Sequence, residues 1–131
     1  MKNTDGFYRI VLENIYDGVY IVDPERRILF WNKGAERITG LTAEELVGTL
    51  CMESPLHHLD SQGRLLCDEG CLVAETLTDG LPRQAELYVR HKDGYNVPVA
   101  VRVSPVRAPD GSIAGAVEVF SDNSSKEATI E

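Results

Sequence analysis

The chain has 131 residues and a formal net charge of −8, from 21 acidic and 13 basic side chains. A chain of this length forms a single domain around one core. The negative charge argues against a nucleic-acid partner, because the phosphates would be repelled. No run approaches the roughly 18 apolar residues that a membrane-spanning helix needs, and the N-terminus lacks the apolar segment of a signal peptide. We therefore expect a cytoplasmic domain with no direct membrane contact.

Residues 1–16 predict a flanking helix that precedes the main fold. Apolar side chains recur along it at helical spacing, namely Phe7, Ile10, Val11, Leu12 and Ile15. Such a stripe has to be buried against something. Two alternatives follow from the sequence: the helix packs on the sheet of its own chain, or it forms the seam of a dimer.

Residues 18–32 predict a β-hairpin that runs directly into short helices. Two short apolar runs flank the polar, turn-forming segment 23–27. Asn32 follows the second run and is a candidate helix cap. Thr42 and Glu45 have the spacing and chemistry of a capping box, which predicts a second short helix.

The second half of the chain has the alternation that is typical of antiparallel strands. Apolar and polar residues alternate over 85–90 and 97–103, and a further strand is predicted over 113–120. Asp-Gly pairs at 93–94 and 110–111 predict the turns between these strands. With the first hairpin, the sequence predicts about five strands in one antiparallel sheet.

Two stretches carry a resemblance to a known family. The segments GVYIVDPERRILFWNKGAERITGLTAEELVG (residues 18–48) and RHKDGYNVPVAVRVSPVRAPDGSIAGAVEVFSD (residues 90–122) resemble the PAS domain. The resemblance implies an α+β fold, with a five-stranded antiparallel sheet, short helices that cover one face, and a flanking helix at 1–16. It places the domain at 17–122, and residues 123–131 then begin a linker to an output domain.

All three cysteines and two of the three histidines fall within residues 49–78. An odd number of cysteines is poorly explained by a disulfide framework. Cys67 and Cys71 would share a face on a helix. Cys51 with His57 or His58, of which we select His58, could complete a Cys3His set for zinc or an iron–sulfur cluster. Two alternatives stay open: the cysteines form a redox pair, or they are small apolar fillers of the core.

Haem and flavin, which some PAS domains bind, fit the sequence less well. The resemblance places the haem ligand on the helix of the middle segment, but no histidine occurs between His58 and His91, and His58 or a thiolate would have to serve. Cys51 stands where light-sensing relatives have their flavin-reactive cysteine, but Leu50 replaces a characteristic asparagine. Glu118 replaces a glutamine, and a carboxylate donates no hydrogen bond unless it is protonated.

A small organic ligand is the remaining class of cofactor. Tyr20, Trp31 and Tyr88 could line a pocket or fill the core. Arg83 could bind the carboxylate of such a ligand, or it could pair with acidic neighbours on the surface.

We expect no catalysis by this domain, because it has no nucleophile elbow, phosphate-binding glycine loop or zinc-protease motif. The resemblance implies a sensory domain of a bacterial signalling protein, similar to those ahead of diguanylate cyclase or histidine kinase domains. It also implies a homodimer through the N-terminal helix and an output domain in the same chain. A signal in region 51–71 would then pass through residues 122–124 to the output. The alternative is a structural dimerisation or protein-interaction module without a ligand.

Overall fold

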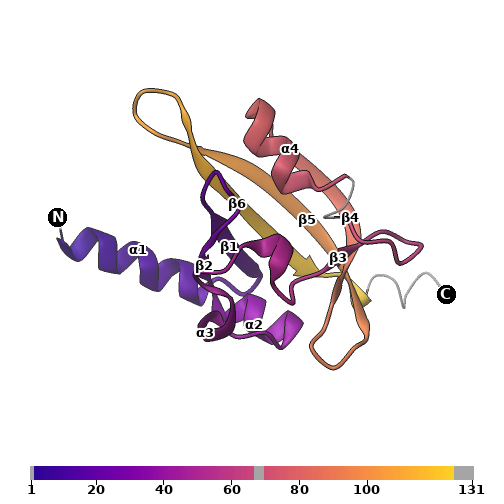
Figure 1. Cartoon of the computed structure of the whole chain (residues 1–131). Coiled ribbons are helices and arrows are strands. Elements are labelled where there is room, and N and C mark those ends of the chain that lie inside the picture. The colour runs from indigo at the N-terminus through magenta and orange to yellow at the C-terminus, as the bar shows by residue number, and fades with distance from the viewer. Residues whose placement is uncertain (1, 67–69, 126–131) are drawn as a thin grey trace.

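The computed structural model describes residues 2–66 and 70–125, with side chains from Gly6 onward. Its elements in chain order are α1 (Lys2–Asn14), β1 (Gly18–Val22), β2 (Ile28–Trp31), α2 (Lys33–Thr39), α3 (Ala43–Leu46), the 3-10 turn η1 (Cys51–Glu53), β3 (His58–Leu59), α4 (Leu72–Asp79), β4 (Arg83–Arg90), β5 (Asn96–Arg107) and β6 (Ile113–Asp122). The strands form one antiparallel sheet in the order β2-β1-β6-β5-β4-β3. The predicted α+β fold is confirmed (Figure 1).

The first hairpin forms as its sequence predicts. The Asp23 carboxylate accepts hydrogen bonds from the backbone N–H groups of Glu25 and Arg27, at 2.9 and 2.8 Å, and this closes the turn between β1 and β2. Arg26 adopts a left-handed backbone conformation (φ 69°), which is unusual for a residue other than glycine. The turn thereby projects Arg26 beside the middle segment of the chain.

Local capping signals determine the two short helices that follow. Asn32 is fully buried, and its side chain accepts from the N–H groups of Val19 and Ala35, so it caps α2 and ties it to β1. The capping box of Thr42 and Glu45 forms with both of its hydrogen bonds. These predictions are confirmed.

The long strands β4 and β5 alternate between a buried and an outer face, as their sequences predict, and β6 forms where a strand was predicted and alternates from Ala116 onward. The sheet also has a sixth strand, β3, where the sequence predicted five. It pairs His58 with Val89 at the edge of the sheet. Two residues are too short a run to show alternation, so no sequence pattern indicated this strand.

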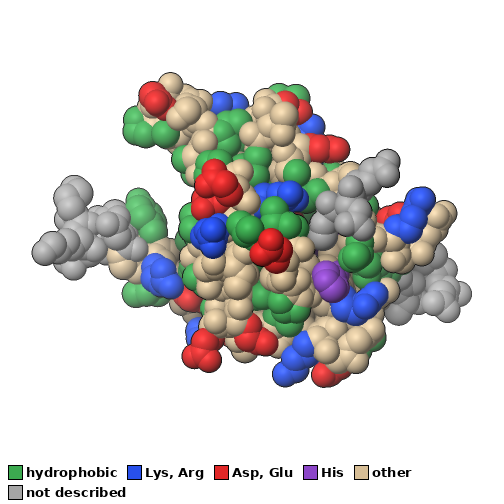
Figure 2. Space-filling model, viewed as in Figure 1, with side chains coloured by type: hydrophobic (Ala, Val, Ile, Leu, Met, Phe, Trp, Pro, Cys, Tyr) green, Lys and Arg blue, Asp and Glu red, His purple; other side chains and the backbone are tan. Residues whose placement is uncertain are grey.

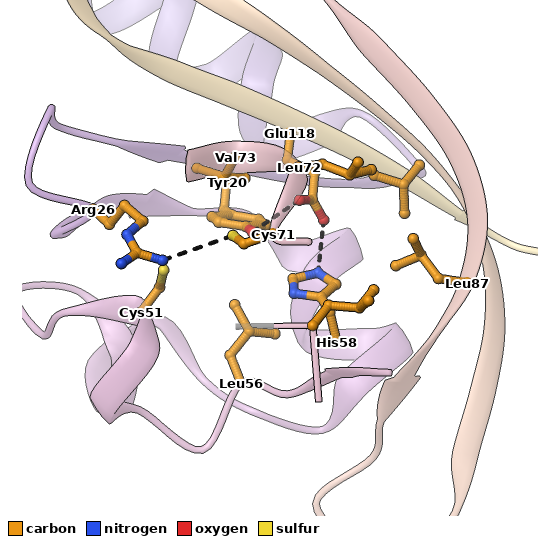
Figure 3. A pocket seen from close by; sticks show the side chains of 12 residues that line it. Tyr20, Arg26, Cys51, Leu56, His58, Cys71, Leu72, Val73, Leu87 and Glu118 are labelled. Carbon is orange, nitrogen blue, oxygen red and sulfur yellow. Dashed lines mark hydrogen bonds and ion pairs between the residues drawn. The ribbon is translucent and has the colours of Figure 1, made fainter. Parts of the chain in front are cut away.

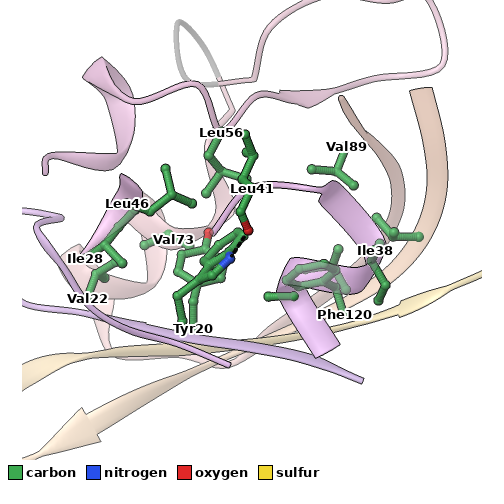
Figure 4. Close-up of a cluster of buried hydrophobic side chains, with 14 of the residues drawn as sticks. Tyr20, Val22, Ile28, Ile38, Leu41, Leu46, Leu56, Val73, Val89 and Phe120 are labelled. Atoms are coloured by element: carbon green, nitrogen blue, oxygen red, sulfur yellow. Dashed lines mark hydrogen bonds between the residues drawn. The ribbon is translucent and has the colours of Figure 1, made fainter. Parts of the chain in front are cut away.

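One core fills the concave face of the sheet, under the helices. Tyr20 and Phe120 from the sheet meet Leu46 and Leu56 from the covering segments, and Val73 of α4 reaches the same cluster (Figure 4). We use the name "the cap" for residues 51–66 and 70–79, which comprise η1, β3 and α4. The helical parts of the cap cover this face, and β3 joins the cap to the edge of the sheet.

The N-terminal helix α1 extends away from this body (Figure 1). It packs against α2 rather than across the sheet. Its apolar side chains are consequently open to solvent, with Phe7 and Ile10 both 61% exposed, and they form part of the green surface in Figure 2. No helix in the described part of the chain is long and apolar enough to cross a lipid bilayer.

Candidate functional site

A pocket lies between the concave face of the sheet and the cap (Figure 3). Its walls are apolar and consist of Leu56, Leu66, Leu72, Val73, Leu87 and Val101. Three polar residues, Tyr20, His58 and Glu118, form one end, and Arg26, Cys51 and Cys71 form the other. The void is about 20 Å³, which is room for about one water molecule.

The polar end is a hydrogen-bonded trio from three different elements. The Tyr20 hydroxyl on β1 donates to Oε1 of Glu118 on β6 at 2.9 Å. His58 Nε2 on β3 lies 2.9 Å from Oε2 of the same carboxylate. Because an ionised carboxylate can only accept, Nε2 is the nitrogen that carries the proton. Both oxygens of Glu118, which is only 3% exposed, therefore have a donor.

Burial and the neighbouring charges shift the pKa values of two members of this trio. Burial, followed by the negative charge of Glu118, raises the pKa of Tyr20 well above its usual value, so its hydroxyl stays protonated and donates. Burial by itself lowers the pKa of His58. The charge of Glu118 and its hydrogen bond outweigh that effect, and the pKa of His58 is raised. A protonated His58 therefore forms a buried ion pair with Glu118, which links the cap to the centre of the sheet.

Arg26 organises the other end of the pocket. Its backbone carbonyl accepts from the N–H of Cys51 at 2.9 Å, and its Nη1 lies 3.8 Å from Cys71 Sγ. Cys71 is the N-cap of α4, and its sulfur accepts from the N–H of Ala74 at 3.5 Å. Cys51 through its backbone and Cys71 through its side chain thus contact the same arginine.

The structure brings together three of the four predicted metal ligands, since Cys51, His58 and Cys71 all line the pocket. Cys67 lies outside the described residues. The sequence predicted that Cys71 lies on the face of a helix. In the structure it is instead the N-cap of α4, which begins at Leu72. Within the described ranges, no group of three or more histidine, cysteine or acidic side chains has the geometry of a metal site. Metal binding by this set stays a prediction.

The four predicted ligand-binding residues have different locations. Tyr20 lines the pocket, whereas Trp31 is buried beside it in the core and donates from Nε1 to the Leu41 carbonyl at 2.8 Å. Tyr88 is on the opposite face of β4 from the buried Leu87 and Val89, because successive side chains of a strand point to opposite sides.

The sequence left two alternatives for Arg83, a ligand carboxylate or acidic neighbours on the surface. In the structure it pairs with acidic neighbours. It pairs with Asp79 at 2.6 Å and with Glu75 at 3.1 Å, both on α4. Its hydrogen bonds hold the pKa of Asp79 far below the usual range. This cluster joins α4 to β4 on the surface, away from the pocket lining.

Sequence reasoning missed Arg26, and it considered Glu118 only as a replacement for a glutamine. A signal for Glu118 was present. Ala116 and Phe120 alternate with outward residues and are buried, so Glu118 between them has to face the core as well. A carboxylate at a core position needs buried donors, which marks a candidate site. For Arg26, within a polar turn, no comparable signal exists.

Comparisons with known proteins agree with this architecture. A family model for the PAS domain matches residues 17–125. Over 113 residues, 86% of this chain and 10% of the relative, the chain is 28% identical to a probable diguanylate cyclase, DgcE, of Escherichia coli K12. It thus spans about a tenth of that relative's length.

Solved structures share the fold. The PAS domain of a protein from Colwellia psychrerythraea superposes with a TM-score of 0.72 at 20% identity, over 91% of this chain and 96% of that one. An RNA-binding Light-Oxygen-Voltage receptor superposes with a TM-score of 0.77 at 17% identity, over 97% of this chain and 35% of that one. At these identities the likeness concerns the fold alone.

Proposed function

The chain belongs to the PAS domain family, and from this premise we propose that it is the sensory domain of a bacterial signal-transduction protein. In this proposal the pocket under the cap receives a small ligand, a metal or a redox signal. The domain itself regulates and does not catalyse. The observation that supports the proposal best is the buried trio, because His58 on the cap and Glu118 in the sheet make the packing of the cap depend on what occupies the pocket.

A short route leads from the trio to the end of the domain. Glu118 and Asp122 are on the same strand, β6. Beyond it the N–H of Asn123 donates to the Pro98 carbonyl, and the N–H of Ser124 donates to the Asp122 carboxylate, both at 2.8 Å. These bonds anchor the segment that leaves the sheet. A movement of the cap that shifts Glu118 would therefore also shift the segment after β6 between two packing states.

The proposed receiver of that change is an output domain in the same polypeptide, in the cytoplasm. The similarity to a probable diguanylate cyclase supports that class of output. A histidine kinase is the other class that the sequence resemblance implies.

Two measurements with Glu118→Gln test this function. In the full polypeptide, we expect the substitution to change the output activity at least fivefold, because the neutral amide no longer pairs with a charged His58. In the domain, it should change the hydrogen exchange of the amides at 119–124. Glu44→Gln, on the exposed surface of α3, is the control and should change neither quantity. If Glu118→Gln behaves like the control in both measurements, the pocket has no sensory role.

The exposed stripe of α1 supports dimerisation as a second function. Phe7 and Ile10 are both 61% exposed, and an apolar helical stripe of this kind is stabilised when a second surface covers it. We expect Ile10→Ser to lower the fraction of dimer in analytical ultracentrifugation, with Asn14→Ser on the same helix as the control. A purely structural module would also dimerise in this way, but Glu118→Gln would not change the output activity.

A further inference from the structure

We infer that the pocket receives a small, flat, largely apolar molecule that carries an N–H donor, and that the imidazole of His58 occupies the place of that molecule until it binds. This inference rests on the proposed sensory function and specifies the chemical class of the ligand.

Glu118 determines what the polar end can accept. Its carboxylate is buried, and each of its two oxygens has one donor. A buried carboxylate oxygen that loses its donor is left unsatisfied, and this destabilises the folded protein. A ligand that enters this end therefore has to supply an N–H or O–H in place of the one that it displaces. A ligand carboxylate would instead meet the negative charge of Glu118.

Tyr20 is fixed in place, so it is not the donor that a ligand replaces. It is 1% exposed, and its ring packs against Trp31 and Phe120 with centroid separations of 5.4 and 6.3 Å. Moving it would open the core. His58 is the replaceable donor.

His58 lies in a less extensive element. Its ring stacks on Tyr20 at 6.3 Å, but its strand β3 has only two residues and lies at the edge of the sheet. This strand pairs with β4 on one side, and on the other it has one bridge, from Leu59 to Leu65. Its side chain is still 18% exposed and therefore already reaches solvent. A shift of β3 away from β4 would withdraw the imidazole without disturbing the central strands.

The size of the void supports an exchange of this kind. At about 20 Å³ it accommodates no more than a water molecule, so an organic ligand has to displace a side chain. The space that His58 would leave has the shape of a five-membered aromatic ring. Figure 3 shows Leu56 and Leu87 beside this ring, and their aliphatic side chains would contact an apolar body but offer it no polar groups.

Chemical rescue with imidazole tests the inference on this chain. His58→Ala should bind free imidazole at least tenfold more tightly than the unsubstituted protein, measured by calorimetry. His58→Gln keeps a donor for Glu118 and should gain no such affinity. His91→Ala is the matched histidine control, because His91 stacks on Tyr95 outside the pocket. In the His58→Ala background, Glu118→Met removes the acceptor and should abolish binding.

Two further probes define the ligand class. Toluene has a similar size but no donor, and acetate has only acceptors; both should bind His58→Ala at least tenfold more weakly than imidazole does. In the unsubstituted protein, where no variant has to fold, millimolar imidazole should shift the NMR signals of the His58 ring and of the Glu118 amide.

Equal binding of toluene and imidazole, imidazole binding that survives Glu118→Met, or unmoved His58 and Glu118 signals would each overturn the inference. None of these results would overturn the sensory function, which is tested by the output activity of the full polypeptide. Conversely, if imidazole binds as expected while Glu118→Gln changes neither the output activity nor the hydrogen exchange at 119–124, the ligand class stands and the sensory function fails.

Discussion

The sheet and the cap meet at the same pocket but are built differently. Strands β4, β5 and β6 have 8, 12 and 10 residues and pair along most of their length. In the cap, strand β3 has two residues, η1 has three and α4 has eight. The sheet therefore provides a rigid floor that holds Glu118, whereas the cap brings His58 to it on a short edge strand. From this difference we expect the cap, rather than the sheet, to move in the proposed exchange of His58 for a ligand.

The largest expected effect comes from breaking the floor. Phe120→Ala should lower the free energy of unfolding by about 3–5 kcal/mol, because it leaves a cavity among Tyr20, Trp31 and the rest of the core. Urea denaturation measures this loss. Leu29→Ala, on the exposed face of β2, is the control and should cost less than about 1 kcal/mol. Similar losses for both substitutions would contradict the description of the sheet as the rigid region.

A smaller and more local effect is expected from the cap. His58→Ala should cost about 1–3 kcal/mol, because one oxygen of the buried Glu118 carboxylate loses its donor. Hydrogen exchange should accelerate first at cap amides such as that of Leu66, which donates to the His58 carbonyl, while the amides of β5 and β6 stay protected. His91→Ala should leave the exchange of the cap unchanged. Uniform acceleration over sheet and cap would show that the two regions open together.

The pH dependence of stability sharpens the same comparison with no change of sequence. The pKa of His58 is raised in the folded protein above the value of 6.5 that applies to the unfolded chain. The ion pair therefore contributes its full stabilisation below pH 6.5, and this is lost as the pH rises through the folded pKa. Unfolding at a series of pH values should show this decrease, and His58→Gln should remove it. An NMR titration that places the His58 pKa below 6.5 would contradict the ion pair.

The smallest expected effect lies outside both regions. Thr42→Ala removes the side-chain cap of the one-turn helix α3 and should cost about 0.5–1 kcal/mol. Thr42→Ser keeps the hydroxyl and is the control in the same denaturation experiment. Neither substitution should change the hydrogen exchange of the cap. A change there would mean that α3 supports the pocket directly.

Local signals in the sequence determined most of the framework. The turn at Asp23, the caps at Asn32 and Thr42, and the alternation of β5 each depend on residues a few positions apart, and each formed as predicted. The alternation of β6 also indicates that Glu118 faces inward, although the sequence-based prediction of the site did not use this signal. A pattern of this kind shows which face a side chain occupies, but it does not show which strand lies beside it.

Only the tertiary structure decided how the site is assembled. His58 and Glu118 are 60 residues apart, and Tyr20 and Glu118 are 98 apart, so no local pattern could pair them. They meet because β6 lies beside β1 in the centre of the sheet, while the two-residue strand β3 brings the cap over its concave face. The same packing buried Trp31 in the core beside the pocket and left Arg83 with α4. Such contacts depend on the order of strands and on the path of the cap, which are properties of the whole folded chain.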